Sequence, residues 1–416
     1  MGLNNKGTAI LKEDNINIQP VLLGGDINCY SVARAFHEEY GVKSIAFGRY
    51  ALGATKDSKI IDFRIDKQME DRDKLMENLL KLGDKLEDAG KTPILMGCTD
   101  EYAEFIIDNK EILSDKYVTP YIDKELKDKL IEKELFYQMC EKKGLDYPKT
   151  YIYSKGDKVT EFDFDYPVII KPSDSVLYWQ HPFEGMKKVY IAKNKEEFSQ
   201  ITDTIYKGKY NKSLIIQDFI PGDDSHMRVL TCYSDRHGKV KMMCLGHVLL
   251  EEHTPTAIGN HAAIITEYNQ ELMEKIKDFL EDINYTGFSN FDIKFDPRDN
   301  KYKLFEINLR QGRSNYYVTS SGNNIAKYVV EDRVLNKDLD LSIQKDPFYW
   351  HVVPNSVVYK YVKDKVLVRE AKKLVAEGKE ATSFGYREDL RGNFRRRLYV
   401  FLYNINQIRK YKKYFE

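Results

Sequence analysis

The stretch FDIKFDPRDNKYKLFEINLR, residues 291–310, decides the fold that we predict for this chain. Two apolar segments flank residues 296–300, whose Asp, Pro and Asn favour a tight turn, so the stretch is typical of a β-hairpin. Successive side chains of a strand point to opposite faces, which puts Glu306 and Asn308 on one face and lets Asp292 join them from the partner strand. The alternate residues would fill the core behind: Phe291, Ile293, Phe305, Ile307 and Leu309.

Asp292, Glu306 and Asn308 form the candidate metal site. Their side chains carry oxygen atoms, and Mg²⁺ prefers oxygen ligands from the protein together with water and substrate phosphates. The alternative is a polar sheet face that binds nothing. Arg310 and Arg313 directly follow the hairpin, where a guanidinium group would neutralise charge on a phosphoryl group during its transfer.

The sequence on either side of the hairpin predicts two kinds of sheet. Residues 166–175, 213–224 and 241–250 are short apolar segments typical of a mostly antiparallel sheet flanked by helices. Residues 18–118 alternate apolar runs with amphipathic stretches, a βαβ rhythm that predicts a parallel sheet. Residues 124–143 have helical spacing and open the next lobe. The predicted fold class is therefore α/β followed by α+β.

Two polar motifs lie where predicted strands of the first domain lead into helices. Gly24-Gly25-Asp26 indicates either a plain tight turn or a substrate-anion site at a helix N-terminus, and it is not the dinucleotide fingerprint. Thr99 and Asp100 are typical of helix N-caps.

Composition excludes several classes of protein. The 416 residues suggest two to four lobes, and the equal numbers of basic and acidic residues, 65 each, argue against a nucleic-acid-binding protein. No stretch of about 18 apolar residues indicates a membrane span and no signal peptide is evident, so we expect a cytoplasmic protein. The five cysteines are scattered, which predicts buried free thiols.

The residues after the hairpin turn carry a resemblance to a known family. Glu306-Ile307-Asn308-Leu309-Arg310 is similar to the E-x-N-x-R metal strand of the ATP-grasp superfamily, and Asp292 matches that family's other metal carboxylate. The resemblance implies a pre-grasp α/β domain followed by two α+β lobes that grip ATP. It also implies ATP and two Mg²⁺ ions as cofactors.

Further upstream, the resemblance assigns contacts with the nucleotide. Lys133 and Lys171 fall where the superfamily places its two phosphate-binding cations, and Asp224 resembles the acid that takes the ribose hydroxyls. The residues at the adenine-contacting strand and hinge are Gln217, Asp218, Phe219 and Ile220.

Within the superfamily, residues 19–335 resemble the bacterial D-aspartate ligases, most clearly in PVLLGGDINCYSVARAF and QDFIPGDDSHMRVL. This resemblance implies an ATP-dependent carboxylate–amine ligase that activates the β-carboxylate of D-aspartate as an acyl phosphate. The acceptor would be the lysine side-chain amine of a peptidoglycan precursor. The implied segments are a pre-ATP-grasp domain (1–123), a lid and nucleotide-binding lobe (124–220), a metal-binding lobe (221–336) and a basic helical extension (337–416).

Several residues are candidates for catalytic roles beside Arg310. Arg228 and Arg313 are predicted to hold the acceptor carboxylate or the acyl phosphate, and Asn290 could donate to an oxyanion. Three histidines are either a general base or ordinarily bonded residues: His247, His253 and His261.

Two segments leave alternatives open. Residues 175–185, at the superfamily's phosphate-covering loop, are rich in aromatic residues and form either a mobile lid or an ordered corner. Residues 391–416 predict an amphipathic basic helix with Leu398, Phe401, Leu402 and Ile405 on one side. This helix either contacts anionic lipid or a nucleotide-linked precursor, or packs on its own protein.

Two other functions remain alternatives at this point. An ATP-grasp ligase for another amino acid, or one that makes a dipeptide, would keep every metal and nucleotide residue named above. A non-catalytic nucleotide-binding protein would be expected to lack a metal ligand or Arg310, and this sequence has them all.

Overall fold

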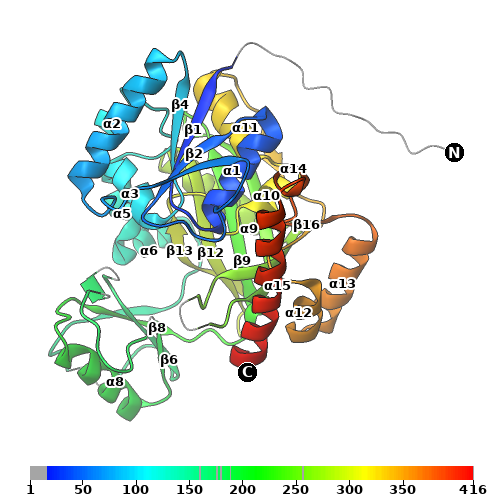
Figure 1. Cartoon of the computed structure of the whole chain (residues 1–416). Coiled ribbons are helices and arrows are strands. Elements are labelled where there is room, and N and C mark those ends of the chain that lie inside the picture. Colours follow the sequence, from blue (N-terminus) through cyan, green and yellow to red (C-terminus); the bar gives the residue numbers. More distant parts are fainter. Residues whose placement is uncertain are drawn as a thin grey trace.

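The computed structural model of the chain describes residues 16–158, 161–174, 177–178, 180–187, 189–254 and 257–415 (Figure 1). Of the predicted phosphate-covering loop, Ser175, Val176 and Trp179 lie outside the described residues. No helix in the described ranges is both long enough and apolar enough to cross a membrane.

The N-terminal domain, residues 16–123, is built on a four-stranded parallel sheet in the order β3-β2-β1-β4, which confirms the predicted α/β class. Its helices are α1, α2 and α3, followed by the short α4 (Figure 1). The elements are β1 (Ile18–Leu23), α1 (Ile27–Tyr40), β2 (Ser44–Gly48), β3 (Ile61–Ile65), α2 (Arg72–Asp88), β4 (Thr92–Gly97), α3 (Asp100–Asp108) and α4 (Lys110–Leu113).

Both turn motifs of this domain begin helices. Gly24 has φ +133°, and a Cβ there would lie 3.0 Å from the Cβ of Cys98, so the turn requires glycine. Asp26 is the N-cap of α1 and accepts hydrogen bonds from the N–H groups of Asn28 and Cys29. Because a carboxylate already bonds these donors, the geometry agrees with the tight turn rather than with an anion site. Thr99 is the N-cap of α3.

The run predicted as one helix over residues 124–143 is two helices, α5 (Lys124–Ile131) and α6 (Lys133–Lys142). Glu132 interrupts it with an extended backbone, φ −76° and ψ 108°. The break makes Lys133 the first residue of α6. Phe136 of α6 packs edge-on against Phe279, with ring centroids 6.2 Å apart, so α6 belongs to the core of the large sheet described below.

A small lobe carries a four-stranded antiparallel sheet in the order β5-β8-β6-β7, with α8 packed on it (Figure 1). Its core is separate from the others and includes Val168, Ile170, Ile205 and Ile216. The elements are β5 (Thr150–Tyr153), β6 (Val168–Pro172), β7 (Tyr190–Ala192), α8 (Lys195–Lys207) and β8 (Leu214–Asp218).

The large sheet runs in the order β13-β12-β9-β10-β11-β15-β16, with β14 paired to β10. Its first five strands are antiparallel, which confirms the α+β class predicted for this region. The elements are β9 (Met227–Ser234), β10 (Val240–Glu251), β11 (His261–Glu267), α9 (Gln270–Asp282), β12 (Gly287–Asp296) and β13 (Lys301–Asn308), then α10 (Tyr316–Ser320), α11 (Ile325–Val329) and a π-helical turn (Val330–Val334).

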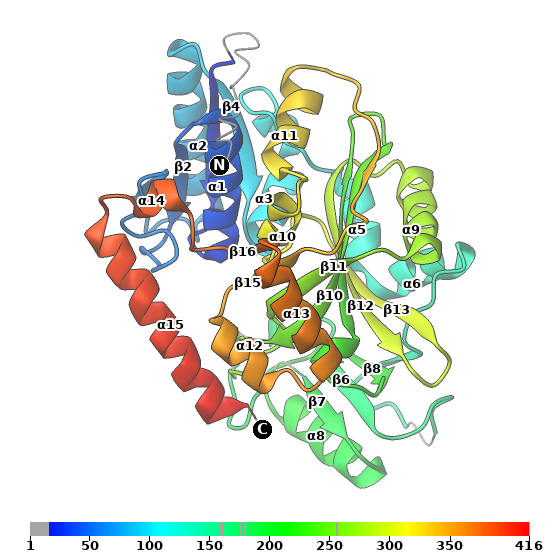
Figure 2. The ribbon, with the colours of Figure 1, turned by 90° about the vertical axis from the view of Figure 1, so that its right-hand side faces the viewer.

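The C-terminal segment is more than a helical extension, because its strands complete the large sheet. β15 pairs with β11, and β16 pairs with β15. The elements are β14 (Ser342–Ile343), β15 (Tyr349–His351), α12 (Asn355–Tyr361), α13 (Lys365–Ala376), β16 (Glu380–Thr382), α14 (Arg387–Leu390) and α15 (Phe394–Tyr414). Figure 2 shows α15 running along the edge of the molecule from α14, beside the N-terminal domain, to the C-terminus near α12.

All five cysteines are buried and free, as predicted. The N-terminal domain shares its cores with the large sheet: Val21 and Leu95 pack in one cluster with Phe291 and Ile307. The small lobe alone has a core of its own. The predicted boundary at residue 124 therefore falls before two helices that pack with the large sheet rather than with the small lobe.

Candidate active site

The predicted metal ligands meet on the β12–β13 hairpin. Asp292 pairs with Glu306 across the two strands, and Asn290 pairs with Asn308, so all four side chains share one face. The Asn308 amide donates to Asp292 Oδ2 over 3.2 Å. A bulge at Phe305 ends this regular register immediately after Asp292.

Electrostatics at this pair favour a cation. Removal from water, together with the negative charge of Glu306, raises the pKa of Asp292 to about 7. Two carboxylates held this close repel each other, and a divalent ion between them would relieve that repulsion. Among the described residues, no group of three or more His, Cys, Asp and Glu side chains is arranged to hold a metal ion. Asp292 and Glu306 are nonetheless a pair of carboxylates, and Mg²⁺ needs only one or two carboxylates when substrate phosphates complete its shell.

Lys133 enters the site from the start of α6. Its Nζ lies 3.1 Å from Glu306 Oε2 and donates to the Phe305 carbonyl over 3.4 Å. Burial disfavours the charged ammonium, but Glu306, Tyr137 and Asp292 together outweigh burial and raise the pKa of Lys133. The lysine is therefore a fixed positive charge beside the carboxylates.

Tyr137, one turn further along α6, links the helix to two other elements. Its hydroxyl donates to the Phe305 carbonyl over 2.9 Å and accepts from Gln217 Nε2 over 2.8 Å. Gln217 is buried on β8 and also donates to Thr150 Oγ1. Gln217 thus holds the small lobe to α6 by its side chain. Sequence reasoning did not single out Tyr137, although its helical spacing from Lys133 places the two on one face.

Lys171 lies on β6 of the small lobe and faces the hairpin. Its Nζ is 5.2 Å from the centre of the Phe305 ring, a cation–π contact. Lys133 and Lys171 therefore approach the same part of the hairpin from two different elements. This is the arrangement needed to bind successive phosphates of a nucleotide.

Arg310 is held by the N-terminal domain. Its Nε and Nη2 lie 2.8 and 2.9 Å from the two carboxylate oxygens of Asp100, at the start of α3, and its Nη1 donates to the Gln311 carbonyl. The hydrogen bonds of Nη2 to Asp100 and of Nη1 to the Gln311 carbonyl, with the short ion-pair distance, orient the guanidinium. Asp100 is thus a positioning residue that the sequence had indicated only as a helix cap.

Gly312 and Asn290 pack directly against each other. A Cβ at position 312 would come within 2.4 Å of Asn290 Oδ1, so only glycine fits there. Asn290 Oδ1 accepts from the Thr231 hydroxyl over 2.9 Å. The amide oxygen of Asn290 is therefore engaged within the protein, and its predicted oxyanion role stays a prediction.

The hinge after β8 is tied to the hairpin by two cations. Arg298, in the hairpin turn, makes a two-point contact with Asp218 at 3.0 and 2.6 Å. Lys294 Nζ donates to the Ile220 carbonyl over 2.9 Å and lies 5.7 Å from the Phe219 ring centre. The four hinge residues predicted from the sequence therefore lie beside the strand that carries Asp292.

Asp224 begins a 3₁₀ helix (Asp224–His226) directly after the hinge. Its Oδ2 accepts from the Glu251 N–H and lies 2.9 Å from His253 Nε2. The predicted ribose-binding carboxylate is therefore fixed at the end of β10, and His253 is its partner.

Arg313 lies among acidic residues from two domains. Its Nη2 donates to Glu252 Oε1 over 3.3 Å, and its Nε lies 3.9 Å from Asp26 Oδ2. Burial raises the pKa of Asp26, and Arg313 counteracts part of that effect. This Arg313–Asp26–Glu252 cluster lies between the N-terminal domain and the β10–β11 loop. Of its carboxylates, only Asp26 had a signal in the sequence, in the Gly-Gly-Asp turn.

Arg228 does not join these residues. It pairs with Ile293 across β9 and β12, on the sheet face opposite to Asp292. Its guanidinium contacts Glu267, which also lies 3.2 Å from His247 Nδ1. Arg228 and His247 are thus partners of one carboxylate on the far face.

His261 lies at the start of β11, buried near Arg313. Burial, with a smaller effect of the Arg313 charge, lowers its pKa to about 4. It is therefore neutral at physiological pH. Its Nε2 is 3.7 Å from Glu251 Oε1.

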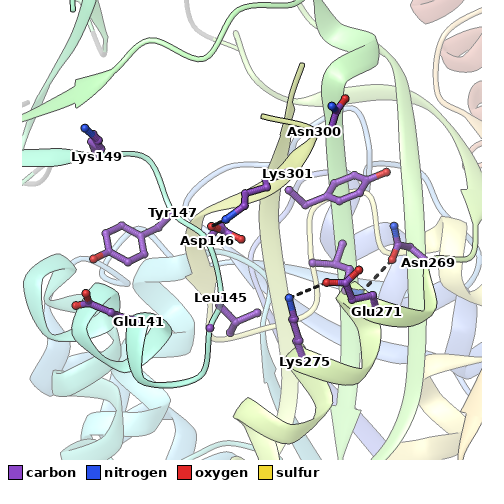
Figure 3. Close-up of a pocket in the computed structure, with 13 residues that line it drawn as sticks. Glu141, Leu145, Asp146, Tyr147, Lys149, Asn269, Glu271, Lys275, Asn300 and Lys301 are labelled. Atoms are coloured by element: carbon purple, nitrogen blue, oxygen red, sulfur yellow. Dashed lines mark hydrogen bonds and ion pairs between the residues drawn. The ribbon is translucent and has the colours of Figure 1, made fainter. Parts of the chain in front are cut away.

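A cavity lined by described residues lies away from the hairpin face that carries Asp292. It has a volume of about 670 Å³ and lies between the end of α6, the start of α9 and the hairpin turn. Figure 3 shows acidic and basic side chains among the lining residues, with Lys275 bonded to Glu271 and Lys301 beside Asp146. None of the predicted site residues lines it, so it is not the candidate active site.

Comparisons with known proteins agree with this arrangement. Residues 133–329 match the model of the carbamoyl-phosphate synthase L chain, ATP-binding domain. The D-aspartate ligase of Enterococcus faecium (strain Aus0004) is 42% identical over 97% of this chain and 98% of its own length. A D-alanine–D-alanine ligase of Wolbachia (strain wRi) is 23% identical over 51% of this chain and 67% of its own length.

Solved structures support the same fold at low sequence identity. An L-amino acid ligase from Bacillus licheniformis gives a TM-score of 0.54 at 12% identity, covering 77% of this chain and 75% of that one. The biotin carboxylase domain of a Hydrogenobacter thermophilus 2-oxoglutarate carboxylase, solved with MgADP, gives 0.55 at 16% identity, covering 79% and 73%.

The fold and the sites at the hairpin define an ATP-grasp enzyme, a carboxylate–amine ligase. Within that class, the chain belongs to the D-aspartate ligase family. The predicted fold class and family are thereby confirmed.

Proposed function

We propose that this enzyme activates the β-carboxylate of D-aspartate with ATP and joins it to the lysine side-chain amine of a peptidoglycan precursor. Full-length similarity to the E. faecium D-aspartate ligase carries the choice of donor. The carboxylates and cations at the β12–β13 hairpin support the reaction class. Because ATP is a substrate, we place the reaction in the cytoplasm.

Amide formation needs an activated carboxylate. A carboxylate oxygen of the donor attacks the γ-phosphorus, the bond from phosphorus to the bridging oxygen breaks, and ADP leaves. Asp292, Glu306 and Asn308 would hold up to two Mg²⁺ ions, which neutralise charge on the transferring phosphoryl group. Lys133 and Lys171 bind the phosphates, and Arg310 stabilises the negative charge of the transition state.

The hinge would receive the rest of the nucleotide. Residues Gln217 to Ile220 offer backbone groups and the Phe219 ring to adenine, and Asp224 offers a carboxylate to the ribose hydroxyls. Asp218 and Lys294 instead fix the hinge against the hairpin, through Arg298 and the Ile220 carbonyl. These two residues therefore contribute to nucleotide binding by holding the hinge in place.

We further propose that the Arg313–Asp26–Glu252 cluster recognises the donor. While its β-carboxylate reacts, D-aspartate presents an α-carboxylate and an α-ammonium group. Arg313 suits the α-carboxylate, and Asp26 or Glu252 suits the ammonium, because such charge-assisted contacts are short and directional. A donor without an α-carboxylate would leave Arg313 without its ligand.

In the second half-reaction, the neutral amine of the acceptor attacks the acyl carbon. The bond from that carbon to the phosphate oxygen breaks, inorganic phosphate leaves and an amide forms. The amine proton passes to solvent or to phosphate. His247 and His253 are bonded to carboxylates, and we assign neither as the general base.

The donor is tested by measuring phosphate release with ATP, Mg²⁺, a lysine-containing muramyl pentapeptide and one amino acid at a time. D-Aspartate should give release and a product whose mass equals acceptor plus D-aspartate minus water. Release with D-alanine or L-aspartate alone would instead favour an ATP-grasp ligase for another amino acid. A protein that binds nucleotide but turns over no donor would refute the proposed reaction.

The metal assignment is tested by Glu306→Gln, which keeps size but removes one anionic ligand. We expect turnover to fall by about three orders of magnitude or more, with an unchanged melting temperature. The matched control is Asp299→Asn, in the turn of the same hairpin, where a carboxylate paired with Lys303 is removed. Full activity of Glu306→Gln would remove this residue from the site.

A further inference from the structure

The long C-terminal helix α15 exposes an apolar stripe. Phe394 is 77% exposed, Phe401 61% and Leu402 52%. Leu398 and Ile408 are also exposed and Ile405 is half-buried, and the spacing of all six residues puts them on one side of a helix. We name these six residues the α15 stripe.

The opposite side of α15 is the one that packs on the protein. Arg396 is fully buried, bonded to Asp389 and to the carbonyls of Gly53 and Ala54 in the N-terminal domain. Tyr411, near the other end, donates to the Glu251 carbonyl. The helix is therefore anchored at both ends by one face, and the α15 stripe is on the other. Figure 2 shows that α15 itself runs along the outer edge of the described chain.

The same helix is strongly basic. Residues 394–414 contain seven Arg and Lys and no acidic residue. The charge of Arg396 is neutralised by its buried contact with Asp389. The exposed cations are Arg395, Arg397, Arg409, Lys412 and Lys413. These exposed cations flank the α15 stripe on both sides and at its C-terminal end. A monomer rarely exposes so many aligned large apolar side chains without a binding role.

We propose that the α15 stripe docks on an anionic phospholipid bilayer, with helix α15 lying in the plane of the membrane surface. Aromatic and aliphatic side chains would enter the headgroup boundary while the flanking cations contact lipid phosphates. A second copy of this chain fits less well, because pairing two such stripes would bring their flanking cations together without any acidic partner. Charge complementarity therefore selects the anionic surface.

Docking in this way does not require the active site to change. The protein-facing side of α15 lies near the Arg313–Asp26–Glu252 cluster, since the charges of Glu252 and Arg313 act on Tyr403, whereas the α15 stripe is on the opposite side of the helix. Membrane attachment would hold the enzyme at the surface with its catalytic residues still open to solvent-borne substrates. The inference consequently stands or falls separately from the choice of donor and acceptor.

The test is flotation of the full-length protein with vesicles of equimolar phosphatidylglycerol and phosphatidylcholine, compared with pure phosphatidylcholine. We expect partition into the anionic vesicles only, weakened by added salt. Phe401→Gln with Leu402→Gln should lower the partition coefficient at least about tenfold. The matched control is Val366→Gln on α13, a residue that is 59% exposed but lies outside the stripe.

Further measurements separate docking from other causes. An unchanged melting temperature and unchanged ATP turnover in the Phe401/Leu402 variant would show that its fold and active site are intact. Equal partition of this variant and the parent protein would overturn the proposal, as would equal partition into neutral vesicles or no partition at all. A change from dimer to monomer in the variant, without vesicle binding by the parent, would overturn it in favour of a second copy.

Discussion

Replacing Asp100 by Asn tests whether the N-terminal domain orients the proposed catalytic arginine. The substitution removes the charge that holds the Arg310 guanidinium at 2.8 and 2.9 Å but keeps the shape of the side chain. The Asp100 side chain is 57% exposed and that of Arg310 only 11%, so the contact is intermediate between a surface pair and a buried one. We therefore expect the contact between Asp100 and Arg310 to contribute about 1–2 kcal/mol.

If this contact acts by orienting Arg310 in the transition state, kcat should fall about 5- to 30-fold. The KM for ATP should change little, since Lys133 and Lys171 are untouched. The assay is steady-state phosphate release at saturating donor and acceptor. Glu101→Gln, the next residue in the same first turn of α3, removes the same charge without touching Arg310. Equal losses in the two variants, or a loss confined to KM for ATP, would refute the reasoning.

Three further predictions follow from the contacts of the site and of α15. Arg298→Ala leaves the buried Asp218 without its two-point partner. We expect the KM for ATP to rise, as measured by nucleotide titration, and the fold to lose about 1–3 kcal/mol, as measured by denaturant unfolding. An unchanged KM for ATP would contradict the proposed role of the Arg298–Asp218 contact. The pKa of Asp292 is raised, so in metal-free protein this group contributes stability at low pH that is lost as pH rises from about 4 to about 7. Mg²⁺ binds the ionised form and should therefore raise the melting temperature more at about pH 8 than at about pH 6, and equal shifts would show that Asp292 is not a ligand. Arg396→Ala leaves the fully buried Asp389 uncompensated and should cost about 3–5 kcal/mol in chemical unfolding, whereas Arg397→Ala, next to it but exposed, should cost less than about 0.5 kcal/mol.

The centre of the site could be predicted because one short stretch of sequence contains the whole pattern that places its residues. Asp292, Glu306 and Asn308 lie within one hairpin, where strand alternation and a turn sequence suffice to put three side chains on one face. The break at Glu132 could not be predicted in the same way, since residues 124–143 keep helical spacing across it. Tertiary packing of α6 overrides that local pattern.

No local sequence pattern predicts contacts between segments that are far apart in the chain. Asp100 and Arg310 are 210 residues apart, and only the fold brings them together. Arg228 was predicted to hold the acceptor carboxylate or the acyl phosphate, whereas the register of β9 against β12 turns it to the sheet face opposite to Asp292. The pattern of α15 predicted an amphipathic helix but not which side would be covered. Its protein-facing side includes Tyr399, Tyr403 and Tyr411, which pack against the core, and Arg396. Tyr411 bonds the Glu251 carbonyl, and Arg396 bonds Asp389.

The contact between Asp389 and the loop after β2 has a consequence for biosynthesis. Asp389 accepts from the Lys59 N–H, a residue made 330 positions earlier, and Arg396 bonds the carbonyls of the same loop. While the chain emerges from the ribosome, the first domain is complete in sequence long before these partners exist. Contacts this distant form late in folding. The loop after β2 should therefore be among the last parts of the first domain to reach its native state, and ribosome-stalled chains that end before α14 should show a protease-sensitive loop there.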